Sequence, residues 1–177
     1  VDSIEHGSYL DAETADLFVA TGAYLVPTLI AGHTVERIAT ERPGFYSPEV
    51  RQKALDVGPV MKNALRIAYE KGVKIAFGTD AGVNDHGTNA YEAVLMNNAG
   101  MPERAILISA TINAADLMGL TDITGTVESG KDADIIAFSG NPLEDISALL
   151  KPSFVMARGN EINLDVPPVD LFPWPDI

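Results

Sequence analysis

Two ionisable residues lie at the ends of short segments of the kind that form β-strands. His6 closes the segment 1–7, and Asp80 follows the segment 73–78 in the turn 79–82. A neutral imidazole and a carboxylate are both good ligands for Zn²⁺ or a similar divalent cation. If the fold delivers both side chains to one place, they predict a divalent-metal site.

Each of these residues also has a simpler interpretation. Asp80 could hydrogen-bond the backbone of its own turn, as most loop aspartates do. A single histidine such as His6 is more often a structural residue than a ligand. His86, in the loop after Asp80, could contact a substrate or be an ordinary polar loop residue. The residues alone leave these alternatives open.

The segment 31–47 contains Gly32, Pro43 and Gly44 and is predicted to be a long connection, which in compact domains is usually functional or mobile. An ordinary structural role is expected for His33. Substrate contacts from Arg37 and Tyr46 are expected only if this connection covers the site. The sequence has no phosphate-binding glycine loop, serine-nucleophile elbow or His-Glu-x-x-His helix, so nucleotide and serine-hydrolase chemistry have no support.

Strands and helices alternate over the first part of the chain, and this alternation predicts parallel βαβ units. In a parallel α/β barrel, reactive side chains lie just beyond the C-terminal ends of the strands. We expect His6 and Asp80 at such ends. The predicted strands are 1–7, 24–29 and 73–78, and the predicted helices are 11–20, 48–71, 88–99, 102–109 and a shorter one from Thr111 or Asn113 to Gly119.

The pattern changes after Leu120, where short strands are separated by turn residues. Strands are predicted at 125–127, 134–139 and 154–158, and Gly159-Asn160 has the chemistry of a hairpin turn. The chain therefore divides into an α/β portion (1–120), a small β unit (121–163) and a proline-rich, extended tail (164–177).

Composition excludes several classes of protein. Of 177 residues, 46% are hydrophobic and the formal net charge is −13, so a packed core is expected and nucleic-acid binding is disfavoured. The longest apolar stretches are far shorter than a bilayer span, and no membrane association is predicted. The chain has no cysteine, which excludes disulfides. Because it begins with Val1, we expect a truncated start, and the cellular compartment stays open.

Several motifs together resemble the amidohydrolase superfamily of metal-dependent hydrolases, near imidazolonepropionase and the Xaa-Pro dipeptidase, or prolidase-like, branch. The resemblance spans residues 1–162. It is carried by Ser3–Gly7 (SIEHG), Phe77–Gly82 (FGTDAG), Asn113–Ala115 (NAA), Gly130–Ile135 (GKDADI) and Gly140–Leu143 (GNPL).

The resemblance implies the C-terminal part of a (β/α)8 TIM barrel, strands six to eight, with part of a small β-sandwich. It implies that His6 and Asp80 are metal ligands, that Asp80 is catalytic and that His86 binds substrate. The cofactor would be one or two divalent ions, with Zn²⁺ favoured. The reaction would be hydrolysis of an amide or peptide C–N bond, in a dipeptide or similar small amide, by a metal-activated hydroxide.

Other activities stay open within this resemblance. They are a cyclic-amide hydrolase, a ring deaminase and a non-catalytic, metal-free remnant of the fold. The remaining ligands of the family, a His-x-His pair, a carboxylated lysine and a further histidine, would precede Val1. The metal site is therefore expected to need a missing N-terminal part of the barrel, and a homo-oligomer is the expected state.

Overall fold

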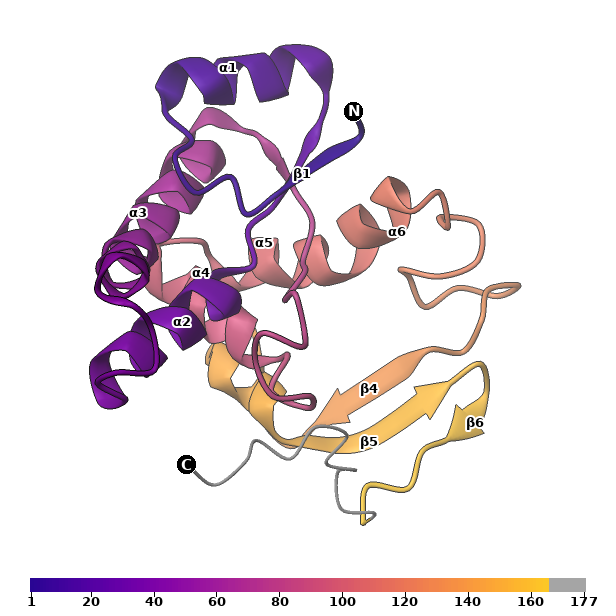
Figure 1. Ribbon diagram of the computed structural model, residues 1–177. Helices are drawn as coiled ribbons and strands as arrows, with labels where there is room; N and C mark the ends of the chain where they lie inside the picture. Colours follow the sequence, from indigo (N-terminus) through magenta and orange to yellow (C-terminus); the bar gives the residue numbers. More distant parts are fainter. Residues whose placement is uncertain (166–177) are drawn as a thin grey trace.

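The computed structural model describes residues 1–165, whose strands form two separate three-stranded sheets (Figure 1). In the first sheet, Ser3 lies opposite Tyr24, and Tyr24 lies opposite Lys74. The predicted parallel βαβ arrangement is confirmed. The strands of this sheet, adjacent in chain order, are β1 (Ser3–Glu5), β2 (Tyr24–Val26) and β3 (Lys74–Ile75).

Two helices begin and end within one residue of the bounds that the sequence predicts. The Asp11 carboxylate accepts a hydrogen bond from the Thr14 backbone N–H at 2.8 Å, and Gly22 ends the same helix with φ of 72°. Ser47 caps the other helix, and Gly72 ends it with φ of 79°. The two helices are α1 (Ala12–Thr21) and α3 (Pro48–Lys71).

The prediction of a long connection over 31–47 is wrong for most of that segment, because α2 spans Leu29–Glu41. Gly32 suggested a break, yet it lies inside the helix and faces α3. A Cβ added to Gly32 would lie 2.5 Å from Met61 Sδ. The glycine therefore permits close packing of two helices instead of ending one.

Beyond β3 the chain is mainly helical up to Leu117. The predicted helix 88–99 begins three residues later, because residues 88–90 form a turn in which the Tyr91 N–H donates to Thr88 O at 2.9 Å. The elements are α4 (Tyr91–Asn98), α5 (Glu103–Ile108), the π-helix η1 (Ser109–Asn113) and α6 (Ala114–Leu117).

The π-helix η1 covers the outer edge of β3. The Phe77 N–H donates to Ser109 O at 3.0 Å, and Asn113 Nδ2 donates to Ile75 O at 2.8 Å. Backbone groups of an edge strand are otherwise open to pairing with another chain. These two hydrogen bonds join the helical segment directly to the sheet.

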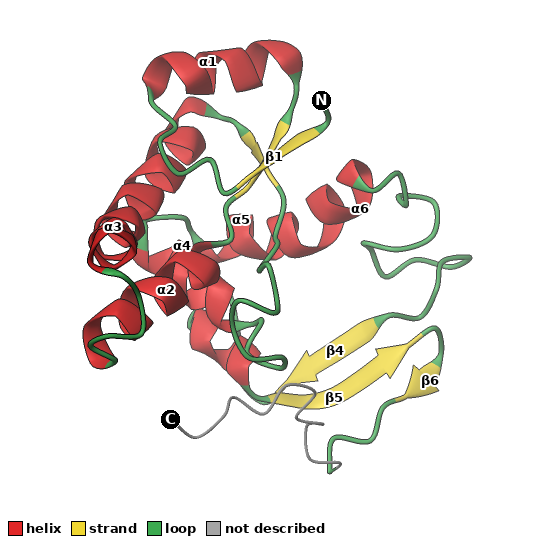
Figure 2. Cartoon of the chain, in the orientation of Figure 1, coloured by secondary structure: helices red, strands yellow, loops and turns green. Residues whose placement is uncertain are grey.

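The second sheet is antiparallel and lies away from α1 (Figures 1 and 2). The predicted strand at 125–127 is wrong, because this segment forms bends and irregular loop. The hairpin turn also falls one residue earlier than predicted, with positive φ at Arg158 and Gly159 (48° and 77°). The predicted extended tail lies outside the described residues from 166 onwards. The elements here are β4 (Ile135–Phe138), the 3₁₀ helix η2 (Ile146–Leu150), β5 (Pro152–Ala157) and β6 (Asn160–Glu161).

The main core lies where the helices pack against the parallel sheet. Its buried side chains come from nearly every element between α1 and η2, and include Phe18, Leu25, Leu65, Ile75, Met96, Ile106 and Ile146. Within residues 1–165, no helix combines the length and the apolar character that a bilayer crossing requires.

Gly78 follows β3 at a point where the chain passes against Val26 of β2. A Cβ on Gly78 would overlap Val26 Cγ1. We therefore expect Gly78→Ala to lower the free energy of unfolding by about 1–3 kcal/mol, as overpacking does. Denaturant unfolding measures this change. The matched background is Val26→Ala, whose smaller side chain leaves space for a Cβ at position 78. In that background, Gly78→Ala should lower the free energy of unfolding by less. Equal penalties in both backgrounds would contradict the close approach.

Candidate active site

Residues with left-handed backbone conformation lie beyond the C-terminal ends of the strands in the parallel sheet. The residues concerned are His6, Thr28 and Asp80, with φ of 66°, 46° and 52°, one after each of the three strands. In the part of the chain described, the only other non-glycine residue with positive φ is Arg158. Such conformations cost about 1–3 kcal/mol each and cluster at functional sites. Because parallel strands run in the same direction, their C-terminal ends lie together at one end of the sheet. This end is the candidate active site.

His6 is tied to the end of β2 through both its backbone and its ring. Its N–H donates to Val26 O at 2.9 Å, and its Nδ1 lies 2.6 Å from Thr28 Oγ1. The rest of the residue is exposed. When Nδ1 carries the proton and donates to the hydroxyl, Nε2 keeps a lone pair for a ligand.

Asp80 is exposed, and its turn is closed by a backbone hydrogen bond, Val83 N–H to Asp80 O at 3.1 Å. Among residues 1–165, no hydrogen bond reaches its carboxylate. The simpler interpretation, a carboxylate bonded to its own turn, is therefore not what the fold contains. The loop after Asp80 is held instead by Asn89 Nδ2, which donates to Thr79 Oγ1 at 3.2 Å.

A buried carboxylate that the sequence did not reveal lies behind these strand ends. Glu92 of α4 has no solvent exposure. Its Oε1 accepts from the Leu29 N–H at 2.9 Å, and its Oε2 accepts from the Ile30 N–H at 2.6 Å. These are the first two N–H groups of α2, whose N-cap, Thr28, provides no side-chain cap. Glu92 thus fixes the start of α2, which begins directly after Thr28, the residue that meets the ring of His6.

Burial raises the pKa of Glu92 to about 7, although its two backbone hydrogen bonds oppose this rise. No sequence signal singles this residue out, because a glutamate in the first turn of a helix normally serves the helix dipole. Its partners lie 62 and 63 positions earlier in the chain, and only the fold brings them together.

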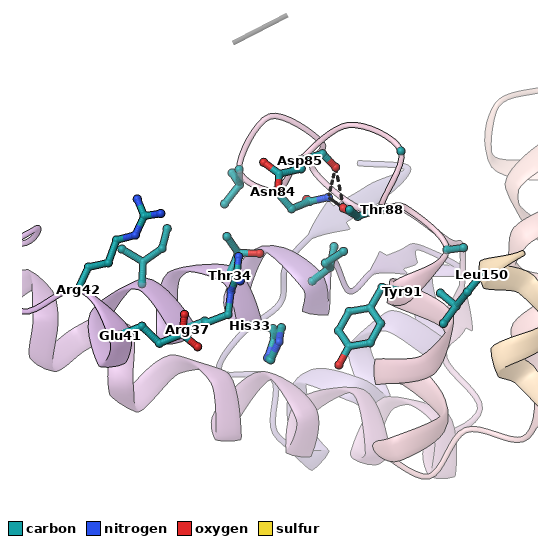
Figure 3. Close-up of a pocket in the computed structure, with 15 residues that line it drawn as sticks. His33, Thr34, Arg37, Glu41, Arg42, Asn84, Asp85, Thr88, Tyr91 and Leu150 are labelled. Atoms are coloured by element: carbon teal, nitrogen blue, oxygen red, sulfur yellow. Dashed lines mark hydrogen bonds between the residues drawn. The ribbon is translucent and has the colours of Figure 1, made fainter. Parts of the chain in front are cut away.

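A cavity of about 560 Å³ adjoins the site, between α2 and the loop after Asp80 (Figure 3). His33 and Arg37 line it. The exposed His86 is not among the lining residues, and neither is Tyr46, whose ring packs edge-on against Phe45. Of Arg37 and Tyr46, which were expected to contact substrate only if the segment 31–47 covers the site, Arg37 lines the cavity. His33, for which only a structural role was expected, lines it too.

The donor chemistry at this end of the sheet fits part of a divalent-metal site. An imidazole whose Nδ1 is held by a hydroxyl and an unpaired carboxylate are the kinds of ligand that such a cation takes. Among residues 1–165 there is no cluster of three or more histidine, aspartate or glutamate side chains that could hold a metal ion by itself. His6 and Asp80 therefore fit as members of a larger ligand set.

Comparison with known proteins gives a consistent result. The amidohydrolase family model matches residues 1–162. A solved Xaa-Pro dipeptidase with methionine bound in its active site is 49% identical, with a TM-score of 0.86 over 92% of this chain and 40% of that chain. A prolidase complexed with N-methylphosphonate-L-proline is 29% identical, with a TM-score of 0.80 over the same shares. Ochratoxinase from Aspergillus niger is 31% identical over 155 residues, 86% of this chain and 31% of that protein. This chain spans less than half the length of each.

The raised pKa of Glu92 predicts how stability depends on pH. Because the folded protein favours the protonated carboxyl, the stability that this proton confers is complete below about pH 4.5 and is lost as pH rises through about 7. Glu92→Gln cannot ionise. We expect the free energy of unfolding of the unmodified protein, relative to Glu92→Gln, to fall by on the order of 3 kcal/mol between pH 4.5 and 8. Urea unfolding of both proteins measures this, and parallel pH profiles would contradict it.

Proposed function

Because the chain belongs to the amidohydrolase family, we propose that it is the C-terminal part of an enzyme that hydrolyses an amide or peptide C–N bond in a small substrate such as a dipeptide. On this proposal β1, β2 and β3 are strands six to eight of a (β/α)8 barrel within residues 1–120. The β4–β6 sheet is then part of a small β-sandwich within residues 121–163.

The arrangement of His6 and Asp80 carries the proposal. Both follow strands of one parallel sheet, both are exposed, and Thr28 lies after the strand between them. Support for the substrate class comes from two solved structures that each cover 92% of this chain, one with methionine bound and one with a proline phosphonate. Methionine is an amino acid, the other ligand is a phosphonate derivative of proline, and both are small.

His6 and Asp80 would hold one or two divalent cations, with Zn²⁺ favoured, together with ligands from a segment that precedes Val1. A cation of this kind lowers the pKa of water and polarises a carbonyl group when it is bound. The Thr28 hydroxyl would fix the ring of His6, so that Nε2 and not Nδ1 faces the cation.

Asp80 would move the proton of the reaction. As the water oxygen forms a bond to the carbonyl carbon, the Asp80 carboxylate accepts a proton from that water. As the C–N bond breaks, Asp80 returns the proton to the departing nitrogen, which leaves as an amine while the acyl part becomes a carboxylic acid. His86, in the loop after Asp80, would contact the substrate.

Asp80→Asn in the complete protein should abolish hydrolysis, because an amide cannot accept the proton. We expect turnover of a dipeptide substrate to fall by at least about 10²-fold, with the thermal midpoint nearly unchanged because the carboxylate is exposed. The matched control is Asp122→Asn, an exposed aspartate outside the site. Turnover within a few-fold of the unmodified enzyme would refute the role of Asp80.

Thr28→Val tests the support of His6. Valine keeps the shape of threonine and removes the hydroxyl that meets Nδ1. We expect metal affinity or turnover to fall about 10–100-fold, and Thr28→Ser should restore much of the loss. Metal content after dialysis and steady-state rates provide the measurements. A Thr28→Val enzyme with unchanged affinity and rate would show that the Thr28 hydroxyl does not support His6.

A further inference from the structure

The residue that precedes α2 is a threonine whose hydroxyl does not serve the helix. A threonine at an N-cap normally has extended backbone, and its hydroxyl accepts from the N–H of the second or third helical residue. Thr28 instead has left-handed backbone, with φ of 46° and ψ of 44°, and its side chain makes no capping hydrogen bond. This conformation is a genuine outlier for a β-branched residue, so the surroundings of Thr28 must impose it.

The hydroxyl of Thr28 meets the ring of His6 instead. Thr28 Oγ1 lies 2.6 Å from His6 Nδ1, and among residues 1–165 this is its one hydrogen-bond partner. Thr28 is buried, so water has little access to the contact. Capping is done from extended backbone, whereas the contact with His6 is made from left-handed backbone. Thr28 can therefore cap α2 or hold His6, but it cannot do both at once.

Glu92 supplies the hydrogen bonds that Thr28 does not. Its Oε2 accepts from the N–H of Ile30, the second residue of α2, at 2.6 Å, and this is a group that an N-cap hydroxyl ordinarily serves. Its Oε1 accepts from the N–H of Leu29 at 2.9 Å. All three residues are buried, and an unpaired N–H in such a place is costly. The start of α2 therefore needs an acceptor, and Glu92 provides it from α4.

We propose that Glu92 is a positioning residue for His6, and that it acts by releasing Thr28 from the task of capping α2. While Glu92 pairs with the first two N–H groups of the helix, the Thr28 hydroxyl is free to hold the imidazole ring. Without Glu92, Thr28 returns to extended backbone, its hydroxyl caps Ile30, and His6 loses its partner. The effect on the ring stands on this exchange alone, whereas its effect on metal binding and turnover rests on the proposed hydrolase function.

Two variants at position 92 of the complete protein remove the acceptors in steps. Glu92→Gln keeps one acceptor oxygen, and Glu92→Met keeps an unbranched side chain but offers no oxygen. The matched control is Met96→Ala, a buried residue of the same helix α4, which opens a cavity in the core and removes no hydrogen bond to α2. Measurements are made near pH 8, above the pKa of about 7 to which burial raises Glu92, so that its carboxylate is ionised.

Nitrogen NMR of the His6 ring in metal-free protein tests the exchange directly. The signals of His6 are those that vanish in His6→Gln. We expect Thr28→Val and Glu92→Met to move both ring-nitrogen signals in the same direction, because the ring loses the same partner in each, and Glu92→Gln to move them less. Met96→Ala should leave them in place. Unmoved signals in Glu92→Met, or an equal movement in Met96→Ala, overturn the proposal. If Glu92→Met does not fold, Glu92→Gln decides by the same comparison.

The affinity for Zn²⁺ gives a second readout. Glu92→Met should weaken Zn²⁺ binding at least about tenfold, as loss of the group that orients a metal-ligating histidine does. In the Thr28→Val background the same change should weaken binding by much less, because the hydroxyl that it would draw away is already absent. Residues that act through one another are not additive. If the two losses simply multiply, Glu92 does not act through Thr28 and the proposal fails.

The role of Glu92 and the hydrolase function fail in different ways. A complete protein whose His6 signals respond to Glu92→Met as expected, but which binds no Zn²⁺ and hydrolyses no amide or dipeptide, overturns only the hydrolase function. A protein that hydrolyses dipeptides, but whose His6 signals do not respond to Glu92→Met, overturns only the positioning role.

Discussion

The bond between the Glu92 carboxylate and the start of α2 is the contact on which the site depends. A helix N-terminus leaves backbone N–H groups unpaired, and here the two that open α2 are satisfied by a side chain with no solvent contact. Because α2 begins directly after Thr28, fixing the helix also fixes the hydroxyl that meets the ring of His6. A buried acid in α4 thus determines the geometry at the ends of β1 and β2.

Left-handed backbone at His6, Thr28 and Asp80 turns the chain sharply at each strand end. Such residues hold their conformation only when their surroundings impose it. The main-chain bond from His6 to Val26, the buried helix start beside Thr28 and the turn closed at Asp80 impose it here. The stability of the core therefore sustains local strain where reactive groups are needed.

The sequence predicted those parts of the fold that local signals specify. The caps Asp11, Ser47, Gly22 and Gly72 marked the ends of α1 and α3, and alternation predicted the parallel strands that carry His6 and Asp80. It failed for elements that distant contacts decide. The helix α2 takes its cap from α4 and packs its glycine on α3, and neither contact is visible in its own residues.

The candidate site shows the same difference between local sequence signals and distant contacts. The sequence nominates His6 and Asp80 because their residue types and positions after strands suggest metal chemistry, but it does not nominate Glu92. The significance of Glu92 arises from its burial and from its distant hydrogen-bond partners. The position of the π-helix η1 against β3 is another property of the assembled fold. A π turn holds one residue more than an α turn, so a turn of this kind can absorb the gain or loss of one residue without rotating the helix beyond it. Ser109 and Asn113, the two residues of η1 that bond to the β3 segment, are the positions that such a change in length would have to spare.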